Sequence, residues 1–143
     1  MPHLSAFADE IAIDLESQLT VLNSEKIAYV EFRSAWGINV LDLSDEQIAE
    51  ARRLFAAHHI NVAAIGSPIG KVPIDSPFED HLRRFRRALT VAQAFSTPYI
   101  RIFSFYPPAG PESDKQPATW RDSAIEHLRE FTRLARASGI TLL

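Results

Sequence analysis

Short runs of β-branched and aromatic residues alternate along the chain with longer stretches in which apolar residues recur at helical spacing. The short runs predict strands over residues 3–8, 27–33, 60–65, 99–105 and 140–143. The longer stretches predict helices from about residue 14, from residue 44, from residue 76, and from about residue 120 to 137. Strands that take turns with helices in this way are typical of repeated βα units around a parallel sheet.

Two of the predicted helices begin with a capping signal. Ser44 is followed three positions later by Gln47, which is the pattern of a capping box. Ser76 is followed by Pro77, a residue suited to the first helical position, and then by Glu79 at the capping-box distance. We therefore expect Ser44 and Ser76 to cap the second and third helices.

The end of the chain decides between two α/β architectures. Gly139 is expected to end the last helix in the left-handed conformation, and residues 140–143 then open a fifth strand. A flavodoxin-like domain needs a further helix after that strand, whereas an eight-stranded barrel takes about 250 residues. We therefore expect the α/β fold of the N-terminal half of a (β/α)8 TIM barrel. It would have four βα units and the start of strand five, in one partial domain over residues 1–143 that is truncated at its C-terminus.

Composition narrows the class of protein further. The 143 residues are 46% hydrophobic and 23% charged, with a net charge of -3 and no cysteine. These values favour a globular domain, exclude disulfides and thiolate metal sites, and argue against a nucleic-acid partner. Since neither a signal peptide nor an apolar run of membrane-spanning length is visible, we expect a cytoplasmic protein without a membrane partner. The basic cluster at residues 83–87 is expected to be a solvated helix face.

Five short strings, each at a predicted strand end or in the loop after it, resemble one known superfamily. They are FADEI at 7–11, YVEFRSAWG at 29–37, NVLDLSD at 39–45, SPIGKVP at 67–73 and YIRIFSF at 99–105. Together they resemble the xylose-isomerase-like TIM barrel superfamily, the sugar phosphate isomerase/epimerase group. The chain departs from that pattern at residues 24–26 and 58–60, where a glycine usually ends the helix, so those caps must be made differently.

The resemblance implies a divalent metal (Mn, Mg, Co or Zn) held by carboxylates and a histidine at the ends of the fifth and later strands. Those ligands would lie beyond Leu143, so we expect no metal site in this chain. The positions of the histidines agree, because none stands at the C-terminal end of a predicted strand. The isolated chain is accordingly expected to be inactive and to associate with itself over its open interior face.

Active sites of (β/α) barrels lie at the C-terminal ends of the strands, which selects the candidate site residues. The residues expected to bind the substrate there are Glu10, Arg33, Trp36, Ser67, Lys71 and Phe105. Asp9 and Phe103 are further candidates. Trp36 and Phe105 would form an aromatic wall for a sugar, and Lys71 would hold a phosphate or carboxylate. No catalytic residue is assigned.

Two further charged residues are expected in the barrel interior. Strand alternation places Glu31 and Arg101 on the face opposite the helices, where a charge needs a partner. We expect a structural ion pair between Glu31 and Arg101, with Arg33 as a further member. The alternative is that one of the two arginines reaches the substrate.

The resemblance implies a fragment of a metal-dependent sugar or sugar-acid isomerase or epimerase that acts by proton abstraction next to a carbonyl. Its ligand would be a small-molecule sugar or sugar acid, and a homo-oligomer is one way to cover the interior face. Two alternatives stay open. One is a lyase of the inosose or dehydroshikimate dehydratase type on the same scaffold, and the other is a non-catalytic TIM-barrel binding module.

Overall fold

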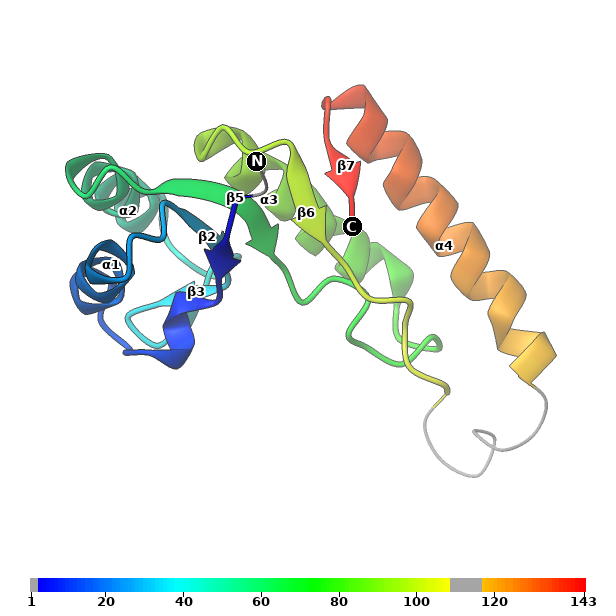
Figure 1. Cartoon of the computed structure of the whole chain (residues 1–143). Coiled ribbons are helices and arrows are strands. Elements are labelled where there is room, and N and C mark those ends of the chain that lie inside the picture. Colours follow the sequence, from blue (N-terminus) through cyan, green and yellow to red (C-terminus); the bar gives the residue numbers. More distant parts are fainter. Residues whose placement is uncertain (1–2, 109–116) are drawn as a thin grey trace.

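The computed structural model describes residues 3–108 and 117–143, which form a partial (β/α) barrel (Figure 1). Five parallel strands pair in the order β1-β2-β5-β6-β7, so neighbours in the chain are neighbours in the sheet. Their bounds are β1 Ser5–Ala6, β2 Tyr29–Phe32, β5 Asn61–Gly66, β6 Tyr99–Arg101 and β7 Thr141–Leu142. The helices between them are η1 Ala8–Glu10, α1 Leu15–Ser24, α2 Asp45–Ala57, α3 Phe78–Ala94 and α4 Pro117–Ala137. The predicted half-barrel, with strand five beside strand four, is confirmed.

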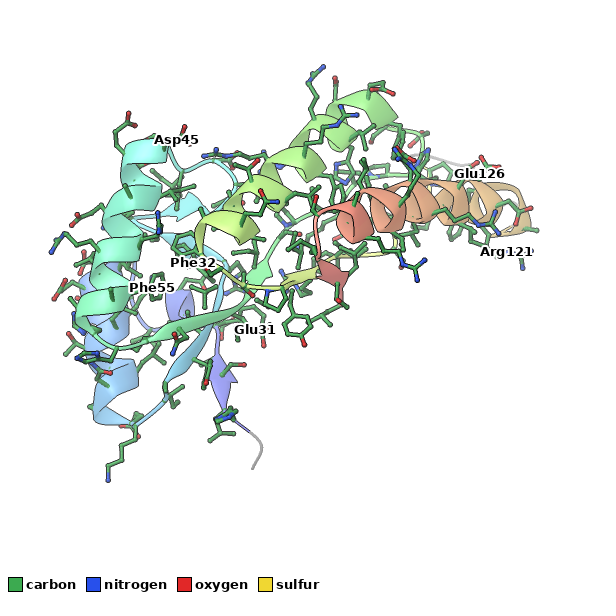
Figure 2. The ribbon with its side chains drawn as sticks, turned by 90° about the horizontal axis from the view of Figure 1, so that it is seen from above. Glu31, Phe32, Asp45, Phe55, Arg121 and Glu126 are labelled. Carbon is green, nitrogen blue, oxygen red and sulfur yellow. The ribbon has the colours of Figure 1, made fainter. Side chains whose placement is uncertain are left out.

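The main core lies between the sheet and the helices. Phe32 of β2 meets Phe55 of α2 and Phe95 at the end of α3, with ring centroids 5.1 Å apart in both pairs and edge-to-face geometry. Figure 2 shows Phe32 and Phe55 between strand and helix, while Glu31 points to the other face of the sheet. Burying such rings contributes about 1.5–3 kcal/mol each and fixes which strand face meets the helices.

Each of the four α-helices ends with a residue in the left-handed conformation. Gly139 has a φ of +69°, as predicted, and Lys26, His59 and Ser96 have φ values of 58°, 56° and 55°. In every case the next residue donates its N–H to a carbonyl five positions back, as in Ile27 to Leu22, which is the Schellman pattern. The expected departure from glycine caps is thus made by ordinary residues held in a strained conformation.

The helix starts agree with one prediction and correct the other. Ser44 Oγ accepts the Gln47 N–H and Gln47 Oε1 accepts the Ser44 N–H, so the capping box of α2 is confirmed. In α3 the N-cap is Pro77, with no side-chain cap, and the predicted role of Ser76 is wrong. The reason is that the helix begins at Phe78, so Ser76 stands one residue before the N-cap position, in a turn where its N–H donates to the Pro73 carbonyl.

The basic cluster on α3 is also partly different from expectation. Arg84 makes a bidentate contact with Asp42 at 2.7 and 2.9 Å, and Arg87 contacts Asp45 at 2.9 Å and the Leu43 carbonyl at 2.7 Å. These two arginines therefore clasp α3 to the segment that enters α2, and the prediction of a purely solvated face is wrong for them.

A small antiparallel hairpin follows β2 and was not predicted. It pairs β3 (Ser34–Ala35) with β4 (Ile38–Asn39) across a two-residue turn. Trp36 and Gly37 form the turn with φ values of 55° and 74°, which is the requirement of a type I′ hairpin.

None of the helices in the described part of the chain has the length and apolarity needed to cross a bilayer.

Candidate functional site

A cavity of about 130 Å³ lies where β2, β5 and β6 end. Its lining consists of Arg33, Asn39, Gly66, Pro68, Lys71, Arg101 and Phe103. All of these residues stand at or just after the carboxyl end of a strand, which is the edge at which barrel active sites form. The cavity therefore brings together three of the cations that the sequence carries at strand ends.

Arg33 is held by two acidic residues from the turn after β1. Its Nε donates to Asp9 Oδ2 at 2.7 Å and its Nη2 to Glu10 Oε1 at 3.1 Å. Ser34 Oγ donates to the same Asp9 oxygen at 2.7 Å. Burial works to raise the pKa of Asp9, but the hydrogen bonds from Arg33 and Ser34 and the Arg33 charge outweigh it and lower the pKa. Asp9 is thus an ionised anchor for Arg33.

Arg101 lies between two aromatic rings. Its guanidinium carbon is 5.2 Å from the centroid of Phe7 and 4.8 Å from that of Phe103, and its Nη2 donates to the Ser67 carbonyl at 3.1 Å. Its Nε is buried and has no hydrogen-bond partner. Burial lowers the pKa of Arg101 and the positive charge of Arg33 lowers it further, and these effects outweigh the charges of Glu31 and Asp9, which act to raise it.

The predicted ion pair between Glu31 and Arg101 is wrong in its partners. Among the described residues no carboxylate lies within 4.0 Å of Arg101, and Glu31 instead accepts a bond from Ser5 Oγ at 3.2 Å. Both residues avoid the helix layer as expected, but the guanidinium of Arg101 packs between aromatic rings at the strand end. The ion pair that forms near the cavity belongs to Arg33.

The loop after β5 is fixed by backbone contacts under the cavity. Gly70 has a φ of +79°, and a Cβ there would stand 1.8 Å from the Phe103 carbonyl oxygen. The Gly70 N–H donates to His81 Nε2 at 2.7 Å, and Phe103 N–H donates to the Ile69 carbonyl at 2.8 Å. Burial lowers the pKa of His81, as do the charges of Arg84 and His127. A neutral His81 thus holds the segment that presents Lys71.

The strand order agrees with the family that the sequence matches. Residues 21–143 match the xylose isomerase-like TIM barrel family. The chain belongs to that family. No curated protein matches the sequence.

Solved members of the xylose isomerase-like TIM barrels share the fold. A xylose isomerase-like TIM barrel protein from Mycobacterium smegmatis in complex with magnesium has 22% identity and a TM-score of 0.74, over 99% of this chain and 53% of that chain. The probable 3-DHS dehydratase from Bacillus anthracis has 15% identity and a TM-score of 0.73, over 99% and 51%. D-Psicose 3-epimerase from Clostridium cellulolyticum has 12% identity and a TM-score of 0.69, over 96% and 50%. The chain therefore spans about half the length of these barrels.

Not all predicted site residues meet at this barrel edge. Glu10, Arg33 and Lys71 lie at or beside the cavity, and Phe103 contributes a ring to it. Ser67 is fully buried, donates to the Arg101 carbonyl at 2.6 Å and accepts the Ile69 N–H, so its hydroxyl is occupied by structure.

The two residues expected to form an aromatic wall lie elsewhere. Trp36 packs near the start of α2, beside Gln47 and Glu50, and outside the cavity. Phe105 is only 8% exposed and packs against Phe131, with ring centroids 6.1 Å apart.

The rings that do flank the cations are Phe7 and Phe103, and Phe7 was not among the predicted site residues. The signal for Phe7 was its place at the end of the first strand, in the FADEI string. Asn39 was missed because it belongs to the unpredicted hairpin.

The described residues do not fit a catalytic metal by themselves. Over residues 3–108 and 117–143 no three His, Asp or Glu side chains are grouped as metal ligands. Asp9 Oδ2 is shared by Arg33 and Ser34, and Glu10 is paired with Arg33. No step of a reaction is therefore assigned to a metal held by these residues.

Proposed function

We propose that this chain is the substrate-holding half of a barrel that isomerises or epimerises a sugar or sugar acid. The observation that carries the proposal is the cavity at the strand ends, where Lys71 and Arg101 meet aromatic rings. Polar groups above an aromatic surface suit a ligand with hydroxyl or carboxyl groups on one side and C–H bonds on the other. The epimerase from Clostridium cellulolyticum, solved with D-tagatose, supports this choice of substrate class.

In the proposed reaction a proton is removed next to a carbonyl, and this chain binds and orients the substrate. Asp9 and Glu10 are poor candidates for the base, because both are paired with Arg33. The base is therefore proposed to come from strands that follow residue 143. A divalent metal is proposed for the complete barrel only, in keeping with the magnesium in the Mycobacterium smegmatis structure.

A lyase is the second candidate, since loss of water from a β-hydroxy carbonyl compound begins with the same proton abstraction. The similarity to the probable 3-DHS dehydratase supports it.

For either enzyme, the cytoplasm is the proposed location. Self-association of the chain is a further proposal.

Proton exchange tests the proposal directly. The barrel with its remaining strands present is incubated in D2O with manganese, magnesium, cobalt or zinc and a panel of ketoses and sugar acids. Deuterium entering the position next to the carbonyl, with a new stereoisomer or isomer in the NMR spectrum, is the expected result. Formation of a conjugated, ultraviolet-absorbing product identifies the lyase instead. Absence of both reactions across the panel refutes the enzyme and leaves a binding module.

A matched pair of variants ties the activity to the cavity. Lys71→Gln removes a cation from the cavity, and Arg83→Gln removes one from the exposed pair with Asp80. We expect the first variant to raise KM and the second to leave it unchanged, and equal effects would contradict a substrate role for the cavity.

A further inference from the structure

The three cations that line the cavity alternate with two aromatic rings, of which Phe103 also lines it. Arg33 lies 4.9 Å from the Phe7 centroid and Arg101 lies 5.2 Å from the same ring. Arg101 and Lys71 lie 4.8 and 5.6 Å from the Phe103 centroid. The negative faces of the rings attract the cations and so offset part of the repulsion among three like charges in one small region.

The direct ion pairs near the cavity go to only one of these cations. Asp9 and Glu10 are both bound to Arg33, whereas neither Arg101 nor Lys71 has a carboxylate within 4.0 Å in the part of the chain that the structure describes. The nearby Glu31 accepts a hydrogen bond from Ser5 Oγ at 3.2 Å. Among the described residues, Arg101 and Lys71 therefore lack a direct carboxylate partner, although the charges of Glu31 and Asp9 act on Arg101 to raise its pKa.

Hydrogen-bond donors at this side are also left over. Arg101 Nε is buried without a partner, which is costly for a charged group unless an acceptor takes its hydrogen bond. Asn39 lines the same cavity, and its Oδ1 accepts the Leu41 N–H at 3.1 Å, so its amide NH2 is the group left to donate. The Lys71 ammonium completes a set of three donors with no acceptor among them.

The space available limits the size of the group that fits. The cavity holds about 130 Å³, which suits one oxyanion group and is small for a whole sugar. Gly66 leaves this room, because a Cβ there would come within 3.2 Å of both Arg33 Cβ and Phe7 Cε1.

We propose that Arg101, Lys71 and Asn39 form an anion subsite that binds the carboxylate or phosphate group of the substrate. Given the proposed function, the substrate is then a sugar acid or a sugar phosphate and a neutral sugar is disfavoured. Charge-assisted bonds to an oxyanion would use the donors that the fold leaves free.

The experiment titrates the chain, without metal or sugar, with inorganic phosphate and separately with acetate at constant ionic strength. Nitrogen-15 NMR of the arginine side chains follows the Nε–H signals, and chloride serves as the ionic control. We expect a saturable shift of the Arg101 signal with at least one of the two anions. The tighter of the two identifies the substrate group, phosphate for a sugar phosphate and acetate for a sugar acid.

Variants make the assignment specific. Lys71 is exposed, so Lys71→Gln leaves the packing intact and is expected to weaken anion binding about tenfold. Arg83→Gln removes the same charge outside the cavity and is expected to bind as the parent chain does. Lack of a saturable Arg101 shift with either anion, or equal weakening in both variants, overturns the subsite.

The two proposals can fail separately. Anion binding without deuterium exchange in the complete barrel refutes the isomerase or epimerase and leaves the subsite standing. Exchange of a neutral sugar by a barrel whose Arg101 signal ignores both anions refutes the subsite alone.

Discussion

Gly70→Ala is expected to destabilise the chain much more than Gly139→Ala, although both glycines have a positive φ. The φ values are +79° for Gly70 and +69° for Gly139. An added Cβ at Gly139 meets nothing within 4 Å, whereas at Gly70 it would stand 1.8 Å from the Phe103 carbonyl oxygen. The pair therefore separates the cost of the backbone conformation from the cost of a collision.

The expected magnitudes follow from these two contributions. A left-handed alanine costs about 1–2 kcal/mol, which is all that Gly139→Ala should lose. The overlap at Gly70 forces the Phe103 backbone to move, and overpacking of this kind costs a further ~1–3 kcal/mol. Gly70→Ala should therefore lose roughly 2–5 kcal/mol, a large fraction of the ~5–15 kcal/mol that stabilises a typical domain.

Urea unfolding of the parent chain and the two variants, followed by tryptophan fluorescence and circular dichroism, measures the difference. Coincident transitions and equal slopes would license the comparison of free energies. Equal losses for the two variants would show that the loop carrying Phe103 moves freely and that the close approach at Gly70 fixes nothing.

Four other outcomes are expected. Ser44→Ala should cost about 1 kcal/mol in the same unfolding experiment, because it removes the capping box of α2. Asp9 has a lowered pKa, so its pairing with Arg33 stabilises the chain above about pH 3.9 and is lost as the pH falls further; Asp9→Asn should flatten that acid limb. His81 also has a lowered pKa, so its contribution is present above about pH 6.5 and is lost below it, when the unfolded chain takes up the proton; His81→Gln should remove that part of the slope and leave the part due to His127. Calorimetry of the isolated chain with manganese, magnesium and zinc should show no tight one-to-one binding, and such binding would reveal a site that the described residues do not form.

The order of the elements could be predicted from the sequence because it depends on local patterns. Period-two and helical spacing identify which segments extend and which coil, and sequential βα units then pair in order. The residues at which strands and helices end could be predicted less well. Strand β6 ends at Arg101 instead of residue 105, because Phe103 and Tyr106 bond to the loop after β5 and not to a neighbouring strand.

The hairpin after β2 and the helix ends show what local patterns miss. Trp36, Lys26 and His59 adopt positive φ values that the sequence does not announce, since bulky residues rarely take them. Local hydrogen bonds at the helix ends accompany Lys26 and His59, and a tertiary contact holds Trp36. The Trp36 N–H donates to the Ile13 carbonyl at 2.7 Å. Such conformations follow from the surrounding hydrogen bonds and not from the residue type.

At the candidate site, the strand face of a side chain could be predicted, whereas its contact partner could not. Strand alternation correctly placed Glu31 and Arg101 away from the helices, but it says nothing about how far a long side chain reaches along the strand. Arg101 reaches the ring of Phe103, two residues away on its own strand exit, and the ring of Phe7 from the first βα unit. A charge can thus be held by aromatic faces as well as by an opposite charge. The rule that an interior cation needs a carboxylate therefore gave the wrong partner for Arg101. Among the described residues, the missing direct carboxylate contact at Arg101 and Lys71 is the property on which the anion subsite depends.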